Sequence, residues 1–535
     1  MLADKLRSVS QQVVPPSGEF GYVGSTSANA ATNVLSLAID KPANVAVGDL
    51  LVAILVSGNT PTVTSSGWTQ QFAGNTRYVF TKLVESGDGA TYTFNQNIST
   101  TFGGSILAFT NAAFDIIGTI SASANPSVAP SITLSTSAFV VDFLSNSGTS
   151  FTTTVPAGWI QLVTDAAAPE AEAIGRFFAA GETGTVSVTV TSPARSILFS
   201  ITPTATMAAR FVAVAHGTTP FISVYPFLEN AGFGQRMANP ATLPVGTGNS
   251  VAFTASGDAI AIAHNTTGVS AYPWSIDGFG TRFTDPATMP VGTGLSVAFN
   301  DAEDAIIVGH STTPFISAYP WSTSGFGTKY TNPASVPSGA GNGVSFNPGG
   351  AYVAVAHTSG TCLSVYPWAA GFGTKITPSG TTLGSPCYSA NFAPDNSGIA
   401  VSGGVTPYIA GYPWSGSFGT RYADPATLPP GSSDTIIFSP SGTTVAVAHS
   451  TTPFISAYAW SAGFGSKYAD PASLPGSTGR GVVFSDTEQT VFYVSASTPF
   501  VAAYKWSSGF GDKYANPSPL PPAAALDVGF CKITL

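Results

Sequence analysis

Apolar and polar positions recur along the second half of the chain with a period of 46 or 47 residues. Each period contains short β-branched or alternating runs separated by Gly, Ser, Asp and Pro, which is typical of strands joined by turns. In one period we predict strands at residues 250–253, 259–264, 269–274 and 281–284. A Tyr, followed in most periods by Pro-Trp or a close variant, marks the third strand of each period: Tyr225, Tyr272, Tyr319, Tyr366, Tyr412, Tyr458 and Tyr504.

Four short strands in a repeat of this length are the signature of a β-propeller blade, and seven periods predict seven blades. The first period begins at its second strand, residues 211–216, without a first strand before it. The final run, residues 526–530, is in phase with the first strand of the other periods. We therefore predict that the C-terminal strand closes the ring. The pattern resembles the WD-type propellers, although the Trp-Asp dipeptide is missing.

A weaker duplication covers residues 20–203. Gly67-Trp68 recurs as Gly158-Trp159, and Ser105-Ile106-Leu107 recurs as Ser196-Ile197-Leu198, both 91 residues later. With alternating strand patterns between them, these pairs predict one jelly-roll-like β-sandwich with two related halves. The expected all-β chain is then divided into an N-terminal arm (residues 1–19, with a short helix at 4–13), the sandwich (20–204) and the propeller (205–535).

The sandwich region carries phrases that resemble a β-sandwich module common in the tail and structural proteins of bacteriophages and in some secreted bacterial proteins. They are AVGDLLVAILV at residues 46–56, SGWT at 66–69, YVFTK at 78–82 and GGSILAFT at 103–110. The resemblance implies a structural context and supplies no catalytic positions.

Charge and hydropathy mainly exclude classes of partner and location. Charged residues make up only 8% of the chain and the net charge is −9, without a basic run, so we expect no nucleic-acid partner. No run of eighteen apolar residues occurs, so we expect no membrane insertion. The first twenty residues lack an apolar core, so we expect no secretory signal and synthesis in a host cytoplasm.

Several residue types recur at one position of the repeat, which favours a scaffold role over chemistry. The His residues end the second strand, where a shared metal is excluded by the spacing of neighbouring blades and bonding to turn hydroxyls is expected. The Trp residues are large enough to fill the outer gap between blades. These repeated positions are His216, His264, His310, His357 and His449, and Trp274, Trp321, Trp368, Trp414, Trp460 and Trp506.

Catalytic sets are missing from the pattern: it contains no unique carboxylate pair, Ser-His-Asp set, phosphate loop or Cys/His metal spacing. We therefore expect no enzyme, no cofactor and no metal. Two cysteines do break the repeat, since Cys362 replaces a Phe and Cys387 replaces a Gly in loops on one face. They predict a disulfide or at least a close thiol pair.

The expected function is a non-enzymatic phage virion protein, a tail fibre, spike or capsid decoration. Residues 1–204 would dock on other virion proteins as a homo-oligomer, and the propeller would adhere to a host-surface glycan or protein. The alternatives are a bacterial surface or secreted adhesin and, less favoured, a propeller enzyme such as a lactonase or glycosidase. The candidate binding residues lie in repeated loops: Thr218, Thr219, Phe221, Thr312, Thr313, Phe315, Thr451, Thr452 and Phe454.

Overall fold

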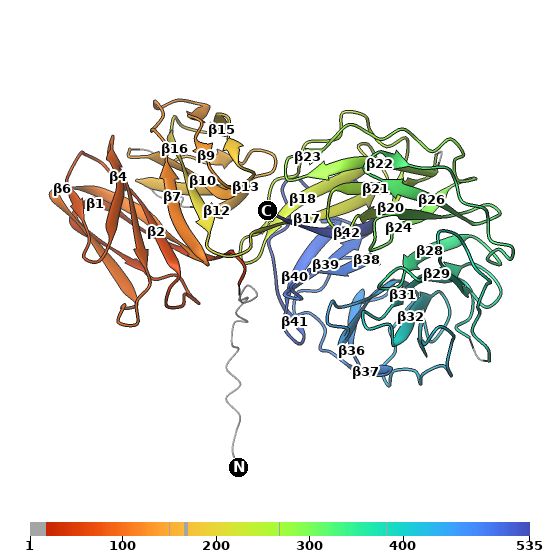
Figure 1. Cartoon of the computed structure of the whole chain (residues 1–535). Helices are drawn as coiled ribbons and strands as arrows, with labels where there is room; N and C mark the ends of the chain where they lie inside the picture. The colour runs from red at the N-terminus through yellow and green to blue at the C-terminus, as the bar shows by residue number, and fades with distance from the viewer. Residues whose placement is uncertain (1–17, 149, 165–168, 267, 381) are drawn as a thin grey trace, which may run out of the picture. The chain divides into compact units, whose positions relative to one another are not determined.

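The computed structural model describes residues 18–148, 150–164, 169–266, 268–380 and 382–535, and every helix or strand element in these ranges is a β-strand (Figure 1). The prediction of an all-β chain is confirmed. The predicted N-terminal helix lies outside the described residues. Within the described ranges, no helix with the length and apolar character of a membrane span occurs. The described residues form two compact units: one contains Arg210–Tyr225 and Met237–Ile533, and the other contains the described part of residues 18–209, Pro226–Arg236 and Thr534–Leu535.

The N-terminal unit contains two five-stranded antiparallel arrays in the same spatial order. The first runs β1-β6-β2-β5-β4, with β3 paired to β6, and the second runs β7-β16-β10-β13-β12. The strands of the first are β1 Gly21–Asp40, β2 Leu50–Ser57, β3 Val63–Thr64, β4 Thr69–Gly74, β5 Arg77–Leu83 and β6 Thr91–Thr110. Those of the second are β7 Ala112–Ile117, β10 Ala138–Asn146, β12 Ile160–Val163, β13 Glu170–Phe178 and β16 Arg195–Pro203. The weak duplication in the sequence thus corresponds to two sheets of matching order.

Each of these sheets carries its own apolar cluster, with Trp68 in the first and Trp159 in the second. Phe109 of the first sheet and Phe139 of the second lie with ring centroids 6.1 Å apart, and Phe139 contacts Phe177 at 4.9 Å. Aromatic contacts therefore join the faces of the two sheets that point away from the separate clusters. Short strands complete the second cluster: β8 Ser127–Ala129, β9 Thr133–Leu134, β11 Thr153–Thr154, β14 Gly181–Glu182 and β15 Val186–Val190.

Seven small antiparallel sheets follow, named here sheets I to VII in chain order. Sheet I combines β17 Ala208–His216, β18 Ile222–Leu228 and β19 Gly232–Phe233 with the last strand, β42 Ala525–Thr534. Sheet II contains β20 Gly248–Phe253, β21 Ala259–His264, β22 Gly268–Ser275 and β23 Gly278–Phe279. Sheet III contains β24 Gly294–Phe299, β25 Ala305–His310, β26 Ile316–Ser322 and β27 Gly325–Phe326. Sheet IV contains β28 Gly341–Phe346, β29 Tyr352–His357 and β30 Leu363–Pro367.

Sheet V contains β31 Cys387–Phe392, β32 Gly398–Gly403 and β33 Ile409–Pro413. Sheet VI contains β34 Ser433–Phe438, β35 Thr444–His449, β36 Ile455–Trp460 and β37 Phe464–Lys467. Sheet VII contains β38 Gly479–Phe484, β39 Thr490–Ser495, β40 Val501–Trp506 and β41 Phe510–Lys513.

The first strand of sheets II to VII lies innermost, and in sheet I β42 takes this position. Strands β20, β24, β28, β31, β34 and β38 contact one another in succession. The amide of Val251 in β20 donates to Asp527 in β42 over 3.0 Å, and a methyl group placed on Gly481 in β38 would lie 3.2 Å from Val528 in β42. The inner strands of sheets II to VII thus follow one another, and β42 contacts both β20 and β38.

The outer strands pack through a repeated aromatic set. Trp321 lies with its ring centroid 5.1 Å from Phe326 of its own sheet and 5.2 Å from Phe283, which follows the last strand of sheet II, edge to face in both contacts. Equivalent contacts surround Trp368, which meets Phe372 and Tyr330. Each of these indoles is buried between two adjacent sheets, where a wide gap must be filled.

The fourth strand differs from its predicted position. In sheet II it pairs only Trp274 with Phe279 and Ser275 with Gly278, immediately after the turn, and residues 281–284 lie outside it. The amide of Phe283 still donates to the carbonyl of Ala271 over 3.0 Å. In sheet IV the pairing shrinks to two isolated bridges, Trp368 with Phe372 and Val365 with Ile376, and in sheet V to one, Trp414 with Phe418. The pairing beside the turn is therefore the constant part of the fourth strand, and the run after it pairs in some sheets only, as Lys467 does with Tyr458.

Candidate functional site

The centre of the C-terminal unit is a channel with a volume of about 640 Å³, lined by residues from the inner strands of all seven sheets. Each inner strand pairs with a neighbour along one edge only. Its unpaired edge faces the channel, and several of its residues line the channel. A cavity of this size lies within the range of roughly 300–1,000 Å³ that holds small organic ligands.

Every inner strand from β20 to β38 carries a bulge at its second residue. In sheet II, Gly248 lies opposite His264 and Ser250 lies opposite Ala263, so Asn249 is an extra residue with no partner across the ladder. The same shift occurs in sheets III to VII. A bulge turns its extra side chain out of the regular alternation, which is why bulges are frequent beside binding sites.

These bulge positions carry different residues in most sheets, whereas the residue directly before the bulge is Gly in four of the six. We call the six bulge residues, all of which line the channel, the bulge ring: Asn249, Leu295, Asn342, Tyr388, Asp434 and Arg480. In sheet I the corresponding residue of β42 is Leu526, followed by Asp527. The ring therefore gives the channel a single, asymmetric set of donors, acceptors and apolar surface.

Two ring members tie neighbouring sheets together. Asn249 donates from Nδ2 to the carbonyl oxygen of Gly294 over 2.7 Å, and Asn342 donates from Nδ2 to that of Cys387 over 2.8 Å. Each amide then presents its Oδ1 as an acceptor. These contacts fix the orientation of the two side chains before any ligand arrives.

The charged part of the channel lies on sheets VI, VII and I. Arg480 donates from Nη1 to Oδ2 of Asp434 over 2.7 Å, and its side chain remains 42% exposed. Burial raises the pKa of the Asp434 carboxyl in spite of this partner. Burial also raises the pKa of Asp527 to about 6, while the amides of Val251 and Val528 favour its charged form. Two carboxyl groups and one guanidinium thus face the same cavity.

The repeated His residues lie outside the channel and are fully buried. The Nε2 atom of His264 lies 2.8 Å from the Ser270 hydroxyl oxygen, and Nδ1 of His216 lies 2.8 Å from the carbonyl oxygen of Thr218. Burial lowers the pKa of His264, His357 and His449 to about 4. The expected hydroxyl partner therefore exists, but it is a serine on the third strand and not a threonine of the turn.

The loops predicted to bind a partner lie at the same end of the unit as the bulge ring, because the end of the second strand pairs with the start of the first. In these loops the threonines are exposed and the phenylalanines are half-buried. The exposed residues are Thr218, Thr219, Thr312, Thr313, Thr451 and Thr452, and the half-buried ones are Phe221, Phe315 and Phe454.

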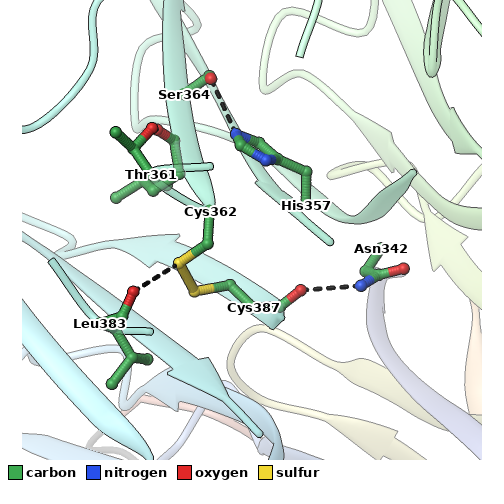
Figure 2. Close-up of a disulfide and its surroundings, with 8 residues drawn as sticks. Asn342, His357, Thr361, Cys362, Ser364, Leu383 and Cys387 are labelled. Atoms are coloured by element: carbon green, nitrogen blue, oxygen red, sulfur yellow. Dashed lines mark hydrogen bonds between the residues drawn. A yellow bond between two sulfur atoms is a disulfide. The ribbon is translucent and has the colours of Figure 1, made fainter. Parts of the chain in front are cut away.

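Cys362 and Cys387 are joined in a disulfide with their Cα atoms 5.3 Å apart (Figure 2). Both are buried, and Cys387 directly precedes Tyr388 of the bulge ring. Among the described residues, no group of three or more His, Cys, Asp or Glu side chains is arranged to hold a metal ion.

Sequence reasoning missed the bulge ring and Asp527. It treated the inner strand as part of the scaffold, and the residues it singled out for breaking the repeat were the two cysteines. When the seven periods are aligned, the bulge position can be found in the sequence. It follows the first residue of the inner strand, Gly248 in sheet II, and its residue changes from each period to the next.

No protein-family model matches the chain, and no curated protein matches it. Several solved structures are similar to part of the chain in fold. One from Bacteroides uniformis, named provisionally as a 6-phosphogluconolactonase, is 12% identical with a TM-score of 0.48 over 60% of this chain and 99% of its own. A Bacteroides fragilis protein with the same provisional name gives 12% and 0.49, over 60% and 98%. The periplasmic gluconolactonase of Pseudomonas aeruginosa gives 12% and 0.47, over 60% and 99%.

These comparisons contradict two predictions, the non-enzymatic phage virion role and the absence of an enzyme, because the similar structures carry the names of propeller enzymes. The phage interpretation rested on strand and turn phrases in the N-terminal region, and such phrases follow from β-structure in general. Neither prediction is retained. At this identity the likeness concerns the fold and assigns no activity to the chain.

Proposed function

We propose that the C-terminal unit binds a small, hydroxyl-rich molecule, of the size of a mono- or disaccharide, at the bulge ring of its channel. The observation that carries the proposal is the contrast between the repeated packing residues and the bulge position, whose residue changes from each inner strand to the next. A scaffold needs the same residue in each sheet. An asymmetric ligand needs different ones.

In this proposal the C-terminal unit is a seven-bladed β-propeller closed by β42, and the N-terminal unit is a β-sandwich of two related sheets. Closure is supported by the pairing of β42 within sheet I. The sandwich is supported by the two arrays of equal order and by the aromatic contacts between them. A closed ring holds the bulge residues of distant periods at fixed separations, which a binding site for a rigid ligand requires.

The chemistry of the ring favours hydroxyl groups. Arg480 supplies donors, the two asparagine amides and the carboxyl groups supply acceptors, and a hydroxyl group can satisfy either kind. Leu295 and Tyr388 supply apolar surface that can pack against the C–H groups on one face of a sugar ring. Asp434 occupies one donor of Arg480, so the guanidinium is held in place and keeps further N–H groups for a ligand oxygen.

Binding is tested by isothermal titration of the whole chain with glucose, maltose, sorbitol, gluconate and glucono-1,5-lactone at pH 7.5. The lactone is hydroxyl-rich and adds a carbonyl acceptor, and its hydrolysis is followed in parallel with a pH indicator. We expect saturable binding of at least one compound in the wild-type chain. Arg480→Met should weaken it about tenfold or more, since a hydrogen bond to a charged group contributes roughly 1.5–3 kcal/mol.

The matched control is Arg421→Met. Arg421 pairs with Asp424 in the connection that follows sheet V, so this variant also removes one guanidinium from one ion pair. It should leave binding unchanged. No binding of any compound by the wild-type chain, or equal loss in the Arg421 and Arg480 variants, would overturn the proposal.

A further inference from the structure

The contact between one sheet and the next is very close at the start of the four inner strands that begin with glycine, β20, β24, β28 and β38. A methyl group added to Gly248 would lie 2.4 Å from the carbonyl oxygen of Phe221 in the preceding sheet, and one added to Gly341 would lie 2.6 Å from that of Phe315. Such distances are shorter than atoms tolerate, so these joints require glycine. The glycine directly precedes the bulge residue, and the joint therefore sets where the bulge residue lies.

The joint between sheets IV and V has different residues at both positions. Cys362 takes the place of the phenylalanine and keeps the same left-handed backbone, with φ of 58° against 69° at Phe221. Its carbonyl oxygen likewise accepts from the amide of His357, over 2.8 Å. Cys387 takes the place of the glycine. The close backbone contact is replaced by a covalent link.

The connection that leads to Cys387 is also irregular. In the neighbouring connections a cation contacts an Asp or Asn three residues later, as Lys329 does with Asn332 and Lys467 with Asp470. Lys375 donates instead to the carbonyl oxygen of Val336 over 2.9 Å. The covalent link therefore joins a connection that lacks the usual polar contact.

Two ring members depend directly on this link. Asn342 donates from Nδ2 to the carbonyl oxygen of Cys387, as Figure 2 shows, and Tyr388 is the next residue in the chain. The sulfur of Cys362 lies 3.2 Å from the carbonyl oxygen of Leu383, which belongs to the same irregular connection. The disulfide thus restrains Cys387, which is followed in the chain by Tyr388 and accepts the hydrogen bond from Asn342.

We propose that the Cys362–Cys387 disulfide positions Asn342 and Tyr388 in the channel, so that breaking it weakens ligand binding while the chain stays folded. The inference rests on the proposed function, since it assigns a positioning role at the same site. The fold should survive without the link, because other joints hold without a disulfide, through close contacts at Gly248 and Gly479 and through the hydrogen bond from Asn249 to Gly294.

The test compares three full-length variants with the wild-type chain: Cys362→Ala/Cys387→Ala, Cys362→Phe/Cys387→Gly and Cys531→Ala. The second rebuilds the joint that other sheets use, and the third removes a buried cysteine that forms no disulfide. Each is titrated with the compound of the panel above that the wild-type chain binds most tightly. Without ligand, hydrogen exchange of the β31 amides is measured against that of β20.

We expect the double alanine variant to remain folded, to bind about tenfold more weakly and to exchange faster in β31 than in β20, because one hydrogen-bonded side chain loses its fixed partner. The Phe/Gly variant should recover most of the affinity, and Cys531→Ala should behave as the wild-type chain does. Unchanged binding and exchange in the double alanine variant would refute the positioning role.

Two further results also count against it. A double alanine variant that is unfolded at 25 °C would show that the link holds the fold and not the site. A folded Phe/Gly variant as weak as the double alanine variant would show that rebuilding the joint does not position the ring. If the wild-type chain binds no compound, the proposed function fails, and the exchange of β31 still decides whether the disulfide restrains that strand.

Discussion

The outer and inner strands of the C-terminal unit follow opposite rules. Outside, the same Trp, Phe and His residues recur in sheet after sheet, and all of the Trp and His side chains are buried. Inside, the bulge position carries a different residue in most sheets and stays partly exposed. The comparison teaches that repetition marks the residues that every sheet needs for packing, whereas variation within a repeat marks the positions that are released from packing.

The outer layer should show the largest effect on stability. Trp321→Ala removes a buried indole that contacts rings of two sheets, and such truncations cost about 3–5 kcal/mol. Urea unfolding followed by circular dichroism measures the change. Leu295→Ala, at a half-buried bulge position, is the comparison and should cost far less. Equal losses would break the distinction between the layers.

Acid should destabilise the chain through the buried histidines. The pKa of His264 is about 4 in the folded chain against an ordinary 6.5, so the unfolded state binds more protons between these values. The stability that neutral His264 supplies is complete above pH 6.5 and is lost as the pH falls toward 4. We expect urea midpoints to fall over this range, and less steeply in His264→Gln. An unchanged pH dependence in that variant would contradict the assignment.

Asp527 should act in the opposite direction and more weakly. Its pKa is raised from 3.8 to about 6, so the folded state favours the neutral acid, and this contribution is lost as the pH rises through 6. Asp527→Asn should therefore raise stability by about 1 kcal/mol at pH 8, after allowance for the partial exposure of the side chain, and by almost nothing at pH 4. Thermal unfolding at the two pH values tests the sign.

The smallest effect on stability is expected at the bulge ring itself. Leu295→Asn introduces the residue that two other bulges carry, and we expect a change within about 0.5 kcal/mol. Ligand preference should change nonetheless, because an apolar part of the ring becomes polar. Titration of the sugar panel with this variant, beside its urea unfolding curve, separates the two effects. A large loss of stability would place Leu295 with the scaffold.

The sequence predicts the strands well where the repeat is strict. The second strand of sheet II, residues 259–264, was placed at its observed bounds because apolar residues fill it on both faces. The fourth strand was misplaced because a two-residue edge pairing leaves no hydrophobic pattern of its own. The bulge ring was missed for a related reason: a bulge depends on register across two strands, and register cannot be deduced from one strand's composition.

The pairing of β42 with β17 has a consequence for how the chain is made on the ribosome. About 300 residues separate the two strands, which at roughly 5–20 residues per second means some tens of seconds of translation. Throughout that time sheet I is incomplete, and the edge of β17, rich in Phe, Val and Ala, has no neighbour from its own chain. Such an edge can pair with another nascent chain. Crowded polysomes should therefore yield aggregates joined at β17, and a β42 peptide supplied in excess should suppress them.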